Sequence, residues 1–259
     1  MPRQLLIWLS SVTFKYYHKP IQIMKNSCIA LLLVPMLWQP ATAQTSPTAE
    51  QIMDKYVAAL GGKDALMAVT DLTMNMSSET DRGAIIIMRK QKLPNKFLMV
   101  INANGMEVMK QTGDGQKVLM GGMQGSQTIE GPAAQQMMLM NTLFPELRYA
   151  ENGVKTTLVG PEKVDGKDTY KLSHTTADGS ATWSDNFDAT TGLKVQSVVT
   201  NKSPRGEMTS TMVYSDYKAT NGIQFPMTIN QQSPRGPMVM TVDNVKVNKG
   251  LKDADFKTQ

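Results

Sequence analysis

Cysteine and histidine are almost absent from this sequence. Among 259 residues, Cys28 is the single cysteine, and His18 and His174 are the two histidines. This composition excludes an internal disulfide, and no H-E-x-x-H or paired-cysteine motif offers a zinc site. A Ser–His–Asp triad would have to use His174, and the G-x-S-x-G motif is missing. We therefore predict no enzyme activity, no metal and no cofactor, and a solvated or hydrogen-bonded structural role for His174.

Phosphate-binding glycine motifs are also missing. Gly121, Gly122 and Gly125 follow an expected strand, but no Lys-Ser or Lys-Thr pair accompanies them. Neither a P-loop nor a dinucleotide-binding fingerprint is therefore present. Asp253 and Asp255 could contact calcium, although a solvated C-terminal tail is the simpler interpretation.

The apolar runs in this sequence are shorter than a membrane-spanning helix requires. The run at residues 29–38 falls below the roughly 20 residues that a spanning helix needs. Lys25 precedes it and the A-x-A sequence Ala41-Thr42-Ala43 follows it. This arrangement predicts a signal peptide cleaved after Ala43 and export to the periplasm. Residues 1–23 are either part of an unusually long leader or lie before the true start at Met24, and we prefer the second interpretation.

Most of the excess of basic over acidic residues lies in this leader. Residues 1–43 hold four of the 27 basic residues and no acid, which leaves 23 basic against 22 acidic residues. A nearly neutral chain with scattered lysines has no nucleic-acid-binding signature. The remaining 216 residues are enough for one domain with a hydrophobic core, which we expect to be monomeric.

Most of the chain alternates between apolar and polar residues, as strands do. Thr48 and Gln51 first predict a capping box at the start of an amphipathic helix that Gly61-Gly62 ends. From Thr70 onward the period is two, and turn signals such as Asn221-Gly222 recur between strands of about eight to ten residues. We predict about a dozen antiparallel strands in one strongly curved, unclosed sheet, a half-barrel whose concave face is covered by helices.

One helix is expected within the series of strands, over residues 131–144. A glycine-rich loop at residues 121–125 leads to it, Gly131 serves as N-cap, Pro132 suits the first turn, and Pro145 ends the helix. The helix is apolar around most of its circumference and rich in methionine, and the chain has 21 Met against 6 Phe. Methionine packs against partners of variable shape. The helix is therefore either a core element or a movable lid over an apolar cavity.

Two similar turns each carry an arginine. Ser203-Pro204-Arg205-Gly206 and Ser233-Pro234-Arg235-Gly236 are separated by two expected strands and so lie at the same end of the sheet. Arg205 and Arg235 could contact an anionic head group or a partner. Ordinary proline-initiated turns with solvated arginines are the alternative, which we favour.

Several short motifs resemble the LolA-like family of periplasmic proteins that sort outer membrane lipoproteins. Residues 92–97, Lys-Leu-Pro-Asn-Lys-Phe, resemble the family's K-R-P-N-x-F strand entry, and Asp114-Gly115-Gln116 resembles its D-G-K hairpin. The segments 50–62, 214–218 and 221–226 are similar to LolA-like envelope proteins as well. Leu93 stands where the dedicated carriers have an arginine that latches the lid, so the resemblance does not supply that latch.

The resemblance implies a carrier whose half-barrel takes the acyl chains of lipoproteins or lipids and makes transient contact with envelope membrane proteins. Our candidates for the apolar lining are Phe97, Met99 and Ile101 on the third strand and Met137, Met140, Leu143 and Phe144 on the helix. Burial of an acyl chain stabilises a complex by about 0.8 kcal/mol per CH₂ group. The alternative is a module of the same fold that senses envelope lipids, or that binds a protein through its sheet edge, and does not carry cargo.

Overall fold

The structure, a computed structural model, describes residues 46–123, 125–203, 206–234 and 236–258. The predicted leader, its cleavage site and the preferred start at Met24 lie outside these residues. The described helices are α1 (Ala49–Leu60), α2 (Lys63–Met67), α3 (Gly131–Met140) and the 3₁₀ helices η1 (Pro145–Arg148) and η2 (Asp253–Phe256). None of these helices is long and apolar enough to cross a membrane.

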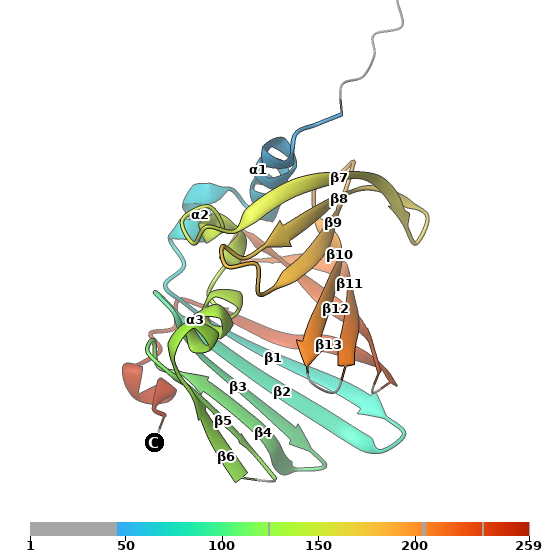
Figure 1. Cartoon of the computed structure of the whole chain (residues 1–259). Coiled ribbons are helices and arrows are strands. Elements are labelled where there is room, and N and C mark those ends of the chain that lie inside the picture. Colours follow the sequence, from blue (N-terminus) through green and yellow to red (C-terminus); the bar gives the residue numbers. More distant parts are fainter. Residues whose placement is uncertain (1–45, 124, 204–205, 235, 259) are drawn as a thin grey trace, which may run out of the picture. The chain divides into compact units, whose positions relative to one another are not determined.

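Thirteen strands within the described residues form one antiparallel sheet. Their order is β6-β5-β4-β3-β2-β1-β13-β12-β11-β10-β9-β8-β7, with β6 and β7 as the two edges. The sheet bends strongly, with α1 and α3 on its concave side (Figure 1). The predicted unclosed half-barrel is therefore confirmed. The strands are β1 (Asp71–Thr80), β2 (Gly83–Lys92), β3 (Lys96–Ala103), β4 (Met106–Gly113), β5 (Val118–Gly122), β6 (Gly125–Ile129), β7 (Lys155–Val164), β8 (Lys167–Thr175), β9 (Thr182–Asp188), β10 (Lys194–Ser203), β11 (Gly206–Thr220), β12 (Ile223–Ser233) and β13 (Gly236–Val247).

Strand register defines an inner and an outer face of this sheet. Leu72 on β1 packs in one cluster with Tyr56 of α1, so its side of the sheet is the inner face. Register places Gln91 of β2 opposite Leu72, and Phe97 of β3 opposite Gln91. The alternate residues point to the outer face, where Phe256 of η2 covers β3.

Helix α1 is fixed by local signals that the sequence carries. The Thr48 hydroxyl accepts a hydrogen bond from the Gln51 backbone N–H at 3.2 Å, and the Gln51 side chain accepts one from the Thr48 N–H at 2.9 Å. The predicted capping box is thus confirmed. Gly61 ends the helix with a φ of 134°, and a Cβ there would lie 2.5 Å from the Gly222 carbonyl oxygen. The end of α1 therefore requires glycine and seats the helix against the β11–β12 turn.

The central helix is shorter than predicted. Residues 131–144 were expected to be helical, but α3 ends at Met140, and its N-cap is Glu130 rather than Gly131. The Asn141 side-chain amide donates to the Met137 carbonyl at 2.8 Å, which closes the last turn. Phe144 then adopts a left-handed conformation with a φ of 45°, so the helix cannot continue to Pro145.

The glycine-rich loop expected at residues 121–125 is not a loop. Gly121 and Gly122 belong to β5, and Gly125 begins the short strand β6, which pairs with β5 from Val118↔Ile129 to Gly122↔Gly125. Glycine disfavours strands but does not prevent pairing where neighbouring strands supply the hydrogen bonds. The two strands form a hairpin that delivers the chain to the start of α3.

Candidate functional site

Three predicted lining residues lie together on the inner face of β3. Phe97, Met99 and Ile101 alternate along the strand, with Met99 opposite Arg89 and Ile101 opposite Ile87 on β2. Phe97 is completely enclosed by its neighbours, whereas Met99 and Ile101 keep partial exposure. The strand therefore presents one fixed and two accessible apolar side chains.

Met99 and Ile101 belong to a cluster that we call the methionine cluster. Its buried centre is Met76, Ile87, Met240 and Val242. The partly buried members around it are Met74, Ile85, Met99, Ile101, Met227, Ile229, Met238 and Val245. Every one of these residues comes from a strand, and no described helix contributes a side chain to the cluster. The methionine cluster is therefore an apolar part of the inner face that the helices leave uncovered.

The other predicted residues are not part of this cluster. Phe97 and Met137 pack with Val118 and Met138 beneath α3. Met140 packs beside Tyr149 and Trp183. Leu143 and Phe144 join the core around α1. The structure thus divides the seven predicted residues among four clusters, and whether they bind a ligand stays a prediction.

Polar contacts attach the segment after α3 to the sheet. The buried Gln91 amide donates to the Asn141 carbonyl at 2.7 Å and to the Thr142 carbonyl at 2.9 Å. The Thr142 hydroxyl donates to the Pro94 carbonyl at 2.9 Å. The Leu93 side chain packs against the core, whereas Gln91 donates the hydrogen bonds to the carbonyls at the end of the helix.

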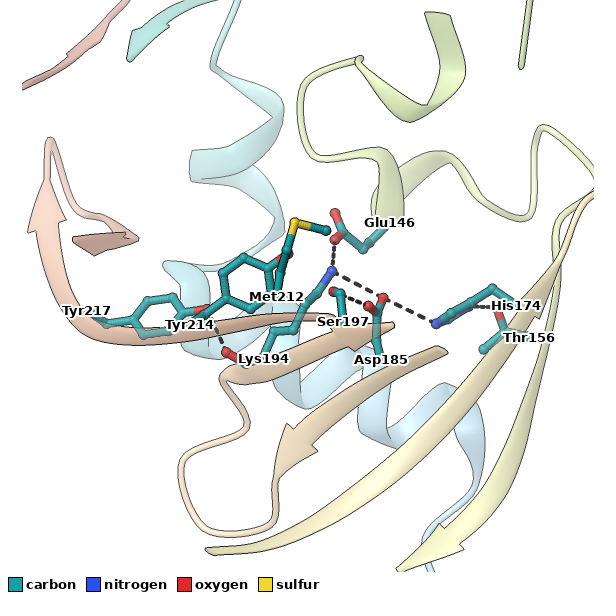
Figure 2. Close-up of polar contacts among 9 residues, drawn as sticks. All are labelled: Glu146, Thr156, His174, Asp185, Lys194, Ser197, Met212, Tyr214 and Tyr217. Carbon is teal, nitrogen blue, oxygen red and sulfur yellow. Dashed lines mark hydrogen bonds and ion pairs between the residues drawn. The ribbon is translucent and has the colours of Figure 1, made fainter. Parts of the chain in front are cut away.

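Further along the segment, Glu146 of η1 reaches a buried lysine. The Lys194 ammonium on β10 lies 2.5 Å from a Glu146 carboxylate oxygen and 3.2 Å from an Asp185 carboxylate oxygen (Figure 2). All three side chains are nearly inaccessible, with side-chain exposures of 11%, 8% and 1% respectively. This ion cluster joins β9 and β10 to η1, which follows α3 in the chain.

The ion cluster shifts the pKa of its members. Burial alone would lower the pKa of Lys194, but Asp185 and Glu146 outweigh burial and raise it well above its ordinary value. Burial would raise the pKa of Asp185, but Lys194 and His174 outweigh it and hold that pKa well below its usual range. Both residues are therefore charged at neutral pH.

His174 extends the cluster toward β7. Its Nε2 lies 3.4 Å from the Asp185 carboxylate, and its Nδ1 lies 2.9 Å from the Thr156 hydroxyl. Ser197 donates its hydroxyl hydrogen bond to Asp185 and not to His174. Ser197 and His174 are therefore not arranged as a nucleophile and its base. His174 is also completely buried, so its ring does not meet a substrate in this conformation.

Aromatic rings enclose the charged groups. The Lys194 ammonium lies 5.4 Å from the centroid of the Tyr56 ring and 5.9 Å from that of Phe187. The Tyr149 ring is 5.5 Å from Trp183, which stacks on His174 at 5.3 Å. Burial raises the pKa of the Tyr56 hydroxyl well above its ordinary value. The charged cluster therefore lies among aromatic rings and is nearly inaccessible to solvent.

The sequence analysis missed Glu146, Asp185 and Lys194. A signal for Asp185 exists, because it alternates with the large apolar residues Trp183 and Phe187 along β9. An aspartate at an inner position of such a strand predicts a buried charge that needs a partner. The partner Lys194 has no comparable signal. The expected structural role of His174 agrees with its buried hydrogen bond.

The remaining candidates lie elsewhere. Arg205 and Arg235 fall outside the described residues, so their proposed contact with a head group or partner stays a prediction. Asp253 lies 2.8 Å from Lys92 and 2.9 Å from Lys96, and Asp255 lies 2.8 Å from Lys90. Lysines of β2 and β3 therefore pair with both aspartates, while the Asp253 side chain stays 67% exposed, and nothing tests a calcium contact.

Comparisons with known proteins identify the fold. No family model matches the sequence, and no curated protein matches it by sequence. A DUF1329 family protein from Desulfovibrio piger superposes with a TM-score of 0.56 at 16% identity, covering 82% of this chain and 98% of the other. A LolA superfamily protein from Nitrosomonas europaea gives 0.55 at 14% identity, with 82% and 99% covered. An outer membrane lipoprotein-sorting protein domain from Vibrio parahaemolyticus gives 0.53 at 12% identity, with 81% and 97% covered. The chain therefore has a LolA-like fold.

Proposed function

We propose that the protein is an exported carrier that binds the acyl chains of a lipid or lipoprotein against the inner face of its sheet. The observation that carries this proposal is the methionine cluster, which is apolar, partly exposed and without helical cover. Each CH₂ group buried there would stabilise the complex by about 0.8 kcal/mol. Methionine side chains can adjust to acyl chains of different length and saturation.

The segment from α3 to η1 contributes no side chain to the methionine cluster in this structure, and we propose that it moves to cover the site when a ligand binds. It is attached to the sheet through Gln91 on one side and Lys194 on the other. The hydrogen bonds that Gln91 donates to this segment can be exchanged for hydrogen bonds to water when the segment moves, at a modest net cost of about 0.5–1.5 kcal/mol each. The buried ion pair with Lys194 is harder to break. We therefore expect the cover to pivot about η1 and to lift at Gln91.

Export is the second part of the proposal. The leader with Lys25, the apolar run at residues 29–38 and the A-x-A sequence before Gln44 support secretion to the periplasm. N-terminal sequencing of the protein from a periplasmic fraction should begin at Gln44. A mature protein that retains residues 1–43 would contradict this part without affecting the lipid site.

The test of the carrier function uses two matched variants. Residues 44–259, purified without detergent, should release a lipid or acylated peptide into organic solvent, to be identified by mass spectrometry. Met99→Gln places an amide in the methionine cluster, and Met88→Gln places the same amide on the outer face of the neighbouring strand. Only Met99→Gln should weaken binding of a fluorescent acyl probe. Equal loss in both variants, or an empty protein that binds no probe, would overturn the proposal.

The free edge at β6 favours a second candidate function, that of a protein-interaction module. The edge strand β7 is guarded by an irregular pairing near Gly160, by Pro161 and by lysines. Strand β6 has the sequence Gly-Ser-Gln-Thr-Ile, without proline or charge, and four of its five residues are exposed. Such an edge can pair with an extended peptide. If this function is correct, Ser126→Lys combined with Thr128→Lys abolishes capture of a partner from an envelope extract while acyl-probe binding persists.

A further inference from the structure

The side chain of one arginine on the inner face has no partner within the described part of the chain. Arg89 lies on β2, where strand register sets it between Met74 of β1 and Met99 of β3. Its guanidinium makes no hydrogen bond or ion pair with any residue that the structure describes. The next residue, Lys90, lies on the outer face and by contrast has a partner, because its ammonium is 2.8 Å from the Asp255 carboxylate.

The surroundings of Arg89 make this isolation costly. Its position adjoins the methionine cluster, and burial lowers the pKa of its guanidinium. An arginine nevertheless remains protonated in proteins, so a full positive charge sits beside apolar side chains. A partly buried charge of this kind normally acquires an anionic partner or hydrogen-bond acceptors.

The neighbouring charges do not supply that partner. Glu146 and the Tyr214 hydroxyl act on Arg89 only electrostatically. Glu146 is already engaged with Lys194 at 2.5 Å. Asp185 is likewise held by Lys194 at 3.2 Å. The carboxylates of Glu146 and Asp185 are thus both committed to the same lysine.

A second unpaired polar side chain lies in the same cross-strand line. Gln111 on β4 is opposite Met99, which is itself opposite Arg89. Gln111 is only 8% exposed, and its side-chain amide makes no hydrogen bond within the described part of the chain. The two polar groups therefore flank Met99 at the margin of the methionine cluster. A guanidinium and an amide can both donate hydrogen bonds to oxygen atoms of a ligand.

We propose that Arg89, assisted by Gln111, binds the anionic head group of an amphiphile whose acyl chain lies on the methionine cluster. The head group is a carboxylate or a phosphate, because arginine pairs with both in a two-point geometry. This inference rests on the proposed carrier function and narrows it to acidic amphiphiles. It also favours free acidic lipids over the uncharged lipid part of an S-diacylglyceryl peptide.

The experiment compares three ligands with the same chain: dodecanoate, dodecyl phosphate and dodecanol. Their dissociation constants are measured at pH 8 by displacement of a neutral fluorescent probe. The wild type should bind the better of the two anions at least tenfold more tightly than dodecanol, a difference of about 1.4 kcal/mol. Whichever anion is preferred identifies the head group as a carboxylate or a phosphate.

Variants then assign the preference to Arg89. Arg89→Met should bind the anions and dodecanol equally, with dodecanol affinity unchanged, and Arg89→Lys should restore part of the preference. Lys90→Met, on the outer face of the same strand, should retain the full preference. Wild type that binds all three ligands alike, or Arg89→Met that still prefers an anion, would overturn the head-group inference alone. Failure of every ligand to bind would overturn the carrier function as well.

Discussion

The two halves of the inner face have opposite chemistry. On β1–β3, β12 and β13, most inner positions carry flexible methionines and branched aliphatic residues, exemplified by Met76 and Met240, with Arg89 and Gln91 of β2 among the exceptions. On β7–β10, they carry aromatic rings and charges, exemplified by Trp183, Asp185 and Lys194. We call these the methionine half and the charged half.

The helices contact the two halves differently. The Tyr56 ring of α1 lies 5.0 Å from Phe187, and Glu146 of η1 is paired with Lys194, both in the charged half. No described helix contributes a side chain to the methionine cluster, although its members Met74 and Val245 also pack against the core that contains α1. The charged half thus holds the helices through aromatic and ionic contacts. The methionine half shares a core with α1 through residues such as Leu72 and Val247, but no helix side chain belongs to its methionine cluster. A binding protein needs both properties, because a cover must be anchored before it can enclose a ligand.

The largest effect should follow from removal of the central cation. Lys194→Met leaves Glu146 and Asp185 buried without their counter-ion, which costs about 3–5 kcal/mol when one partner of a buried pair is removed. Urea denaturation should show this loss in the free energy of unfolding. The control is Lys163→Met, which removes an exposed ion pair with Asp168 and should cost at most about 1 kcal/mol. Similar losses in the two variants would mean that the charged half does not anchor the helices.

Acid should weaken the charged half before the methionine half. The folded-state pKa of Asp185 lies below the unfolded value of about 3.9. Its contribution to stability is therefore complete above that value and is lost as the pH falls through the folded pKa. The urea midpoint of the wild type should drop below about pH 4, and Asp185→Asn should be less stable at pH 7 but less sensitive to acid. Parallel pH profiles for the two proteins would exclude Asp185 as the group responsible.

The attachment at Gln91 should have an intermediate effect. Gln91→Leu leaves the Asn141 and Thr142 carbonyls without their donor, at a cost of about 1–3 kcal/mol. Hydrogen exchange at residues 141–144 should accelerate. Gln231→Leu is the matched control, because the side-chain amide of this partly buried glutamine makes no hydrogen bond within the described residues. Unchanged exchange in Gln91→Leu would show that the cover is held by other contacts.

Local signals made the scaffold predictable. The capping box at Thr48 and Gln51 and the left-handed turn at Asn221-Gly222 depend on residues close in sequence, and both occur as expected. The alternation of apolar residues was sufficient for an unclosed antiparallel sheet. The end of α3 was misplaced because Pro145 was the strongest visible stop signal, whereas Asn141 closes the helix through its own side chain.

The charged half was not predictable by the same means. Lys194 and Glu146 are 48 positions apart, and nothing in their local sequences indicates that they meet. Asp185 could have been recognised as buried from its alternation with Trp183, but its partner depends on how η1 folds back over the sheet. Similarly, the seven predicted lining residues follow from apolar spacing. Their division among four clusters follows from tertiary packing.

The smallest stability change should come from the methionine half, and it tests whether that half is adaptable. Met76 is 7% exposed and packs against Ile87 and Met240. Met76→Leu conserves volume and should cost less than about 1.5 kcal/mol in urea denaturation. Because leucine is stiffer than methionine, the combined change of Met74, Met76 and Met99 to leucine should make probe affinity depend more steeply on acyl-chain length. A loss above about 3 kcal/mol from Met76→Leu alone would exceed the cost of a tolerated swap. The methionine half would then be a tightly fitted core and not an adaptable binding surface, and the contrast between the two halves would lie only in their charge.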